Sequence, residues 1–314
     1  MIDFRYHLVS LVAVFLALTL GIVIGTTQLD RLVLGNLRGQ VGSLDSDKRA
    51  LQREVSGLRQ QVRDGDALTA ALVPRVVAGT LDHARVVLVA TPQAGEALTD
   101  ELQKAVEQAG ARVTGRVQLT DEYSDPQRGA DLKSYVTSGG QPAGFQLPES
   151  DDASVLAAAL LSYVLVRGGT GGPAAGEAAV SQVLSGFASL QVLRTEPGPV
   201  TPGDYAMLVA AEPVRGASAQ ERVRALGQLA AALDGRGHGA VVAGTPAGAE
   251  ADGLVGAVRA DAGLAGAVST VDDANTAAGR IAAVFALAEQ GRGRSGQYGA
   301  ADSAQAPVPP TPSS

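Results

Sequence analysis

The sequence predicts an α/β protein in which an N-terminal transmembrane helix and a parallel coiled-coil stalk precede a mostly parallel sheet flanked by helices. Three observations predict this class: an uncharged apolar stretch, a heptad repeat behind it, and short apolar runs that alternate with helical periods beyond Pro74. We expect an N-terminal tail at 1–7, the transmembrane helix at 8–27, the stalk at 28–65, a linker at 66–79, one α/β domain at 80–290 and a disordered tail at 291–314.

The apolar stretch from Leu8 to Ile24 contains no charge and reaches about 20 residues at Thr27, which is the length that a helix needs to cross the hydrocarbon core. Its large apolar side chains sum to about −4 to −7 kcal/mol on an insertion scale, so insertion into a membrane is favoured. A cleaved signal peptide is the competing interpretation. The stretch is longer than the apolar region of such a peptide, and no Ala-x-Ala site follows it.

The charges around this stretch leave its orientation open. Arg5 precedes the stretch, whereas Arg31 and Arg38 follow it. We expect the N-terminus to lie inside and the α/β domain to lie on the extracytoplasmic side of a single-pass membrane protein, with the lipid bilayer as its first partner.

A heptad pattern follows the apolar stretch. Leu occupies the d positions and Val three of the a positions, a combination that favours a parallel two-stranded coiled coil and predicts a homodimer. The expected dimer seam consists of Leu37, Val41, Leu44, Leu51, Val55, Leu58 and Val62. The alternative is a single amphipathic helix that lies against the domain, although the stripe is narrower than such a helix usually shows.

The rest of the chain alternates strands and helices, which predicts a parallel sheet covered by helices on both faces. We expect strands at 85–90, 113–119, 205–211, 239–243 and 267–270, and helices at 98–109, 153–166, 175–190, 217–233, 253–262 and 275–289.

Ligands of an open parallel sheet bind at the carboxyl ends of its strands, so the segments 91–92, 121–123 and 244–246 are the first places to look for a site. None of them carries a phosphate-binding fingerprint. A G-x-G-x-x-G pattern at 291–296 follows a helix rather than a strand, and we interpret it as chance. The glycine-rich segment 168–172 joins two expected helices and is interpreted as a connector.

The acidic pairs Asp151-Asp152 and Asp272-Asp273 each precede an expected helix, so helix capping explains them without catalysis. The acidic group at Asp121, Glu122 and Asp125 is interpreted as a solvated loop rather than a site for a hard cation.

The remaining candidate donors are few. His83 and His238 fall near strand starts, away from the expected crevice. The chain has no cysteine, and its methionines are Met1 and Met207, the latter in an expected buried strand. We therefore expect no catalytic residues, no evident cofactor and no enzyme, and the metal ligands stay unknown. The formal net charge of −7 without a basic cluster excludes a nucleic-acid partner.

Two segments resemble the actinobacterial copper transport protein family, the MctB-like proteins. They are DFRYHLVSLVAVFLALTLGIVIG at 3–25, with the heptads behind it, and VSTVDDANTAAGRIAAVFALAEQGRGRSGQYG at 268–299. The resemblance runs from Ile2 to about Gly299. It implies a membrane-anchored cell-envelope protein of copper transport or copper homeostasis, and so implies copper.

Corynebacterial relatives in this family are associated with a partner membrane protein and with control of cell-wall hydrolysis at division. The resemblance therefore also implies a second envelope membrane protein as partner. An alternative function stays open at this point: a non-enzymatic coiled-coil scaffold that docks partner proteins controlling cell-wall hydrolysis or cell separation.

Overall fold

A computed structural model of the chain describes the backbone of residues 4–139, 141–169, 174–196 and 198–310, and the side chains of these residues except 4–5 and 26–43. The chain divides into two units, Met1–Gly65 and Asp66–Ser314. Helix α1, Phe4–Val77, forms the described part of the first unit and contributes its last turns to the second. The N-terminal apolar helix expected from the sequence is therefore present.

Helix α1 is longer at both ends than the expected segments. It begins at Phe4, inside the expected tail at 1–7, and it continues through the expected linker at 66–79 as far as Val77. Pro74 lies inside the helix without ending it. The sequence suggested a linker because proline weakens a helix. In the structure Val73 and Val77 are buried in the core of the second unit, and this burial favours the helical conformation there.

The described residues of the second unit contain a seven-stranded sheet in the order β3-β2-β1-β4-β5-β6-β7. Its strands are β1 (Arg85–Ala90), β2 (Arg112–Leu119), β3 (Leu193–Thr195), β4 (Tyr205–Ala210), β5 (Ala240–Gly244), β6 (Ser269–Val271) and β7 (Gln297–Tyr298). All neighbouring strands pair in parallel except β2 and β3, which are antiparallel. The expected mixed α/β class with a mostly parallel sheet is thus confirmed.

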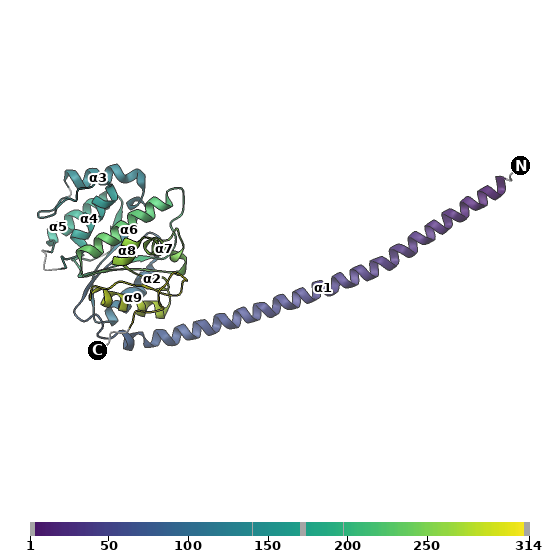
Figure 1. The fold of residues 1–314 in the computed structure, drawn as a ribbon, viewed down its shortest axis with the longest axis horizontal. Helices are drawn as coiled ribbons and strands as arrows, with labels where there is room; N and C mark the ends of the chain where they lie inside the picture. The colour runs from purple at the N-terminus through teal and green to yellow at the C-terminus, as the bar shows by residue number, and fades with distance from the viewer. Residues whose placement is uncertain (1–3, 140, 170–173, 197, 311–314) are drawn as a thin grey trace. The chain divides into compact units, whose positions relative to one another are not determined.

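Helices cover both faces of this sheet (Figure 1). They are α2 (Glu96–Gln108), α3 (Gly129–Ser138), α4 (Ala153–Leu165), α5 (Glu177–Ser189), α6 (Ala219–Arg236), α7 (Leu254–Ala260), α8 (Ala262–Ala267) and α9 (Ala277–Gln290). Alternate strand residues face opposite sides, so Val87 and Val89 pack with α3 to α7, whereas Val86 and Leu88 pack with α2, α9 and the end of α1.

Several elements differ from the expectations. Helix α3, the edge strand β3 and the short helix α8 were not expected, and the helix expected at 253–262 is present as α7, which ends at Ala260. Helix α8 begins directly after α7 for a local reason: the Asp261 carboxylate accepts hydrogen bonds from the backbone N–H groups of Gly263 and Leu264 and so caps α8. The expected connector at 168–172 lies largely outside the described residues.

The C-terminal segment 291–310 has structure, in contrast to the disordered tail expected at 291–314. Residues Gln297–Tyr298 form β7 along the edge of β6, and both side chains are buried. The loop behind β7 turns back, and Gln305 donates its backbone N–H to the carbonyl of Gln297 at 2.7 Å. Composition alone suggested disorder, but the open edge of β6 and a buried arginine hold the segment in place.

Candidate functional site

The described part of the chain contains one helical stretch long and apolar enough to cross a membrane, at Tyr6–Gly25, with a mean hydropathy of 2.7. The side chains of this stretch are exposed. The hydroxyl of Thr19 donates to the carbonyls of Phe15 at 2.8 Å and Leu16 at 3.0 Å, so its polar group is satisfied inside the helix, as hydrocarbon requires. This stretch is the candidate membrane anchor.

The expected dimer seam lies farther along α1. Leu44, Leu51, Val55, Leu58 and Val62 are between 43% and 71% exposed in the single chain. The other two expected seam residues, Leu37 and Val41, lie outside the residues whose side chains the structure describes. The exposed residues of the expected dimer seam are available to a partner helix, and the homodimer stays a prediction.

The carboxyl ends of β1 and β2 come together as the sequence predicts. The side-chain amide of Gln118 donates to the carbonyl of Thr91 at 2.7 Å, and that of Gln93 donates to the carboxylate of Asp121 at 3.2 Å. A cavity of about 550 Å³ opens here, and its lining includes Pro92, Glu96 and Asp121. The third candidate segment, 244–246, is connected to the end of β4 by a hydrogen bond from Thr245 to Ala211.

The acidic group beside this cavity is neutralised by arginines. The guanidinium of Arg222 lies 3.4 Å from Asp121 and 3.5 Å from Asp125, and that of Arg128 lies 3.2 Å from Glu122. Because these carboxylates already have cationic partners, they do not form a site for a hard cation. The expectation of a merely solvated loop missed these ion pairs.

The candidate metal donors do not gather. His83 and His238 are exposed at separate strand starts, and His238 lies edge-on to the ring of Tyr205. Met207 is fully buried in β4. Among the described residues, no three His, Cys, Asp or Glu side chains lie close enough to share a metal ion.

One acidic pair caps its helix as expected and the other does not. The carboxylate of Asp152 accepts from the backbone N–H of Ser154 and caps α4. At α9 the cap is Thr276, whose hydroxyl accepts from the N–H of Gly279. The capping role expected for Asp272 and Asp273 is therefore wrong, because a threonine nearer the helix takes the position.

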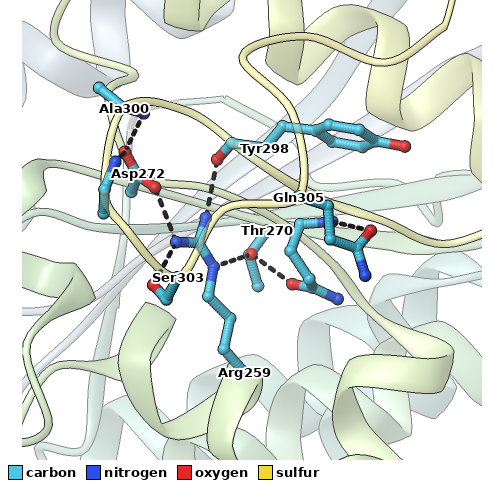
Figure 2. Close-up of polar contacts among 9 residues, drawn as sticks. Arg259, Thr270, Asp272, Tyr298, Ala300, Ser303 and Gln305 are labelled. Atoms are coloured by element: carbon cyan, nitrogen blue, oxygen red, sulfur yellow. Dashed lines mark hydrogen bonds and ion pairs between the residues drawn. The ribbon is translucent and has the colours of Figure 1, made fainter.

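Asp272 instead forms a buried ion pair with Arg259 (Figure 2). The Arg259 Nη1 atom lies 2.7 Å from the carboxylate, whose side chain is fully buried. The same guanidinium donates to the hydroxyl of Thr270 at 2.8 Å and to the backbone carbonyl of Tyr298 at 2.7 Å. The hydrogen bonds around this arginine thus connect α7, β6 and β7.

The other side of the Asp272 carboxylate faces the C-terminal loop. It accepts the backbone N–H groups of Ala300 at 2.7 Å and Ala301 at 3.1 Å, while the hydroxyl of Ser303 accepts a hydrogen bond from Arg259 at 2.9 Å (Figure 2). Periodicity did not reveal this network, since a buried arginine on a short helix looks like a surface residue. The arrangement fastens the C-terminal segment to the sheet, and we assign it no chemistry.

Comparison with known proteins gives matches over nearly the whole chain. The model of the family described as "Copper transport outer membrane protein, MctB" matches residues 1–309. The proteins named Copper transporter MctB in Mycobacterium tuberculosis (strain ATCC 25618 / H37Rv) and Mycobacterium bovis are 31% identical over 302 residues, which cover 95% of this chain and 96% of theirs. The protein of the same name in Mycobacterium leprae is 32% identical over 307 residues, with the same coverage.

Proposed function

The chain belongs to the MctB family of copper transport proteins, and we propose that it acts in copper transport as a single-pass protein of the cell envelope, with its α/β domain on the extracytoplasmic side. The observation that carries this proposal is the family match over residues 1–309, which includes both the apolar stretch Tyr6–Gly25 and the α/β unit. The relatives are named as transporters rather than enzymes, and we propose no catalytic activity.

Copper is the cargo in this proposal and not a resident cofactor. Copper(I) prefers thiolate and thioether ligands, but the chain has no cysteine and Met207 packs in the core, in register with Leu88 and Val241. These residues do not fit a copper(I) centre. We propose that a second envelope membrane protein supplies the soft ligands and the conduit, since a single helix does not enclose a pore.

The exposed residues of the expected dimer seam support a homodimer as the assembled form. Three leucines of the expected dimer seam, Leu44, Leu51 and Leu58, are exposed, and burying them against a second copy would remove apolar surface from water. Replacing all three by asparagine in the full chain should abolish the dimer measured by light scattering in detergent. A dimer that persists in this variant would show that another surface holds the copies together.

The other function left open by the sequence was a scaffold for proteins that control cell-wall hydrolysis or cell separation. No observation on the described residues favours this scaffold over copper transport, and the matched proteins are named as copper transporters.

Growth at raised copper concentration tests the proposed function. A strain without the gene should lose copper tolerance, and the full chain should restore it, whereas a chain lacking residues 8–27 should not. Unchanged tolerance in the deletion strain would contradict the proposal. A reporter that is active on one side of the membrane, fused after Ser314, tests the proposed orientation separately.

A titration addresses the way in which copper is handled. The full chain in detergent is titrated with copper(I) against a competing chelator, and we expect the chelator to retain the metal. A tight site on the chain alone would contradict the assignment of the soft ligands to a partner protein.

A further inference from the structure

The last turns of α1, within the second unit, carry two separate apolar faces. Val73 and Val77 are 4% and 0% exposed and belong to the core that α2 and α9 share. Leu68, Leu72 and Val76 remain 66%, 42% and 46% exposed. A helix that only packs on its own domain needs the first face and not the second.

The face toward the domain is fixed by a polar contact as well as by burial. The carboxylate of Asp66 accepts a hydrogen bond from the backbone N–H of Ala277 at 2.7 Å. At about 100° of rotation per residue, Asp66 projects from the same side of α1 as Val73 and Val77. The exposed face therefore cannot turn onto the domain without breaking this contact and exposing two core residues.

The exposed face lies beside the domain-facing side. Leu72 and Val76 project about 100° around the helix axis from the mean direction of Asp66, Val73 and Val77. A partner helix on this face would lie next to the domain and not through it. The arrangement leaves room for a second helix whose own domain is placed on the opposite side by two-fold symmetry.

The spacing identifies a second copy of the chain as the occupant. Leu72 follows Leu58 by two heptads, and Val76 follows Val62 by two heptads, so they return to the d and a positions of the proposed seam after Gly65 and Thr69, which occupy the positions between. Leu68 falls at a g position, which flanks the same side. Pro74 falls at an f position, so the backbone hydrogen bond that it removes lies on the outer surface.

We propose that a second copy packs against Leu72 and Val76, so that the paired helices extend to the base of the domains and hold the two α/β domains on either side of the pair. This inference rests on the proposed homodimer. It replaces a flexible linker below each domain by a continuous helical connection. The two domains then have a defined orientation relative to each other.

Single cysteines test the proposal, because the natural chain contains none. In the full chain in membranes, Leu58→Cys reports on the proposed dimer and Leu72→Cys on its extension. Val76→Cys is a second report on the extension, should Leu72→Cys fold poorly. Ala67→Cys is the matched control, since Ala67 is exposed at an f position within one turn of Leu68.

Oxidation with diamide followed by non-reducing electrophoresis should give disulfide-linked dimers for the cysteines at 58, 72 and 76, because a disulfide requires Cα atoms within about 4.4–6.8 Å. The cysteine at 67 should leave the chain monomeric. Dimers from position 58 with none from 72 or 76 would overturn the extension and leave the proposed homodimer standing. No dimers from any position would overturn both, and equal dimers from position 67 would overturn the extension as well.

Discussion

The carboxylate of Asp66 on α1 accepts a hydrogen bond from the backbone N–H of Ala277 at the first turn of α9, at 2.7 Å. The first N–H groups of a helix have no partner within the helix, and a carboxylate also suits the positive end of the helix dipole. The hydroxyl of Thr276, the residue directly before α9, accepts a hydrogen bond from the N–H of Gly279. Helix α9 is therefore capped both by Thr276 and by Asp66 of α1. This contact fixes the last turns of α1 on the α/β unit.

Removal of the Asp66 carboxylate should destabilise the second unit by about 1 kcal/mol, the usual effect of losing a helix cap. We expect Asp66→Ala to lower the free energy of unfolding of the full chain and to increase hydrogen exchange at the amides of the first turn of α9. Asp66→Asn keeps an acceptor and should recover most of the loss.

Asp64→Ala is the control for this prediction. Asp64 is exposed, and its carboxylate accepts a hydrogen bond from the side-chain amide of Gln60, one turn earlier on α1. Replacement of Asp64 should leave hydrogen exchange at the amides of the first turn of α9 unchanged. Equal effects from both substitutions would contradict a specific cap by Asp66.

Replacement of Arg259 should be among the most damaging single changes in the domain. Arg259→Met leaves the fully buried carboxylate of Asp272 without its cation, and breaking a buried pair in this way costs about 3–5 kcal/mol. We expect a lower melting temperature and early proteolytic cleavage in the segment 292–310, which the arginine holds in place.

A second substitution separates the lost charge pair from lost packing. Asp272→Asn keeps an oxygen for the N–H groups of Ala300 and Ala301 and removes the charge, so Arg259→Met combined with Asp272→Asn should be more stable than Arg259→Met alone. Lys104→Met, in an exposed pair with Glu101, should have little effect. A double variant no better than the single one would contradict the role of the charge.

Asp273 should make the stability of the domain depend on pH. Burial, and then the neighbouring charge of Asp272, raise the pKa of the Asp273 carboxyl above its ordinary value of 3.8, and its Oδ1 atom is buried without a hydrogen-bond partner among the described residues. The folded state therefore keeps its proton to higher pH than the unfolded state. The contribution of this group to stability falls as the pH rises above 3.8 through the raised pKa.

Asp273→Asn should accordingly stabilise the chain at neutral pH, and the gain should shrink as the pH falls through the raised pKa of Asp273 towards the ordinary value of 3.8. Thermal unfolding between pH 3 and pH 8 measures it. Asp151→Asn is a control of opposite sign, because a hydrogen bond from Lys133 lowers the pKa of the Asp151 carboxyl. A gain from Asp273→Asn that is constant with pH would show that the charge is not its cause.

Two charges in the apolar stretch should prevent insertion. Replacing Leu16 and Leu20 by arginine adds roughly 3 kcal/mol for each central residue on the insertion scale, which is enough to cancel a favourable sum of about −4 to −7 kcal/mol. We expect the variant to be released by alkaline carbonate while the natural chain stays in the membrane pellet. The same pair of substitutions at Leu44 and Leu51 should leave the chain in the pellet, and release of both variants would contradict anchoring by Tyr6–Gly25.

The parts of the fold that the sequence predicts well are those in which burial shows as a simple pattern. The residues 86–90 form a continuous apolar stretch, and they lie in the central strand β1 at the expected position. The apolar stretch before Thr27 and the alternation of strands and helices are equally direct signals. In these segments one face, or the whole element, is apolar, so the local pattern predicts the element without knowledge of its partners elsewhere in the chain.

The parts that the sequence does not predict depend on distant partners. Strand β7 is composed of Gln297 and Tyr298, and it becomes a strand because the edge of β6 is open. Arg259 is buried because its four partners come from β6, from Asp272 directly after it, and from the C-terminal segment. The helical path through Pro74 depends on the core contacts of its neighbours. At the candidate site, the strand ends were predictable from topology, whereas the arginines that neutralise Asp121 and Glu122 come from other helices and loops.

The copper content of cells tests the central claim most directly. A strain without the gene is loaded with copper, washed, and compared with strains that carry the full chain or the Leu16→Arg, Leu20→Arg variant, and cell-associated copper is followed over time by mass spectrometry. We predict that the full chain changes the retained copper relative to the deletion strain and that the variant without an anchor does not. Identical copper content in the deletion strain and the strain with the full chain would contradict a role in copper transport.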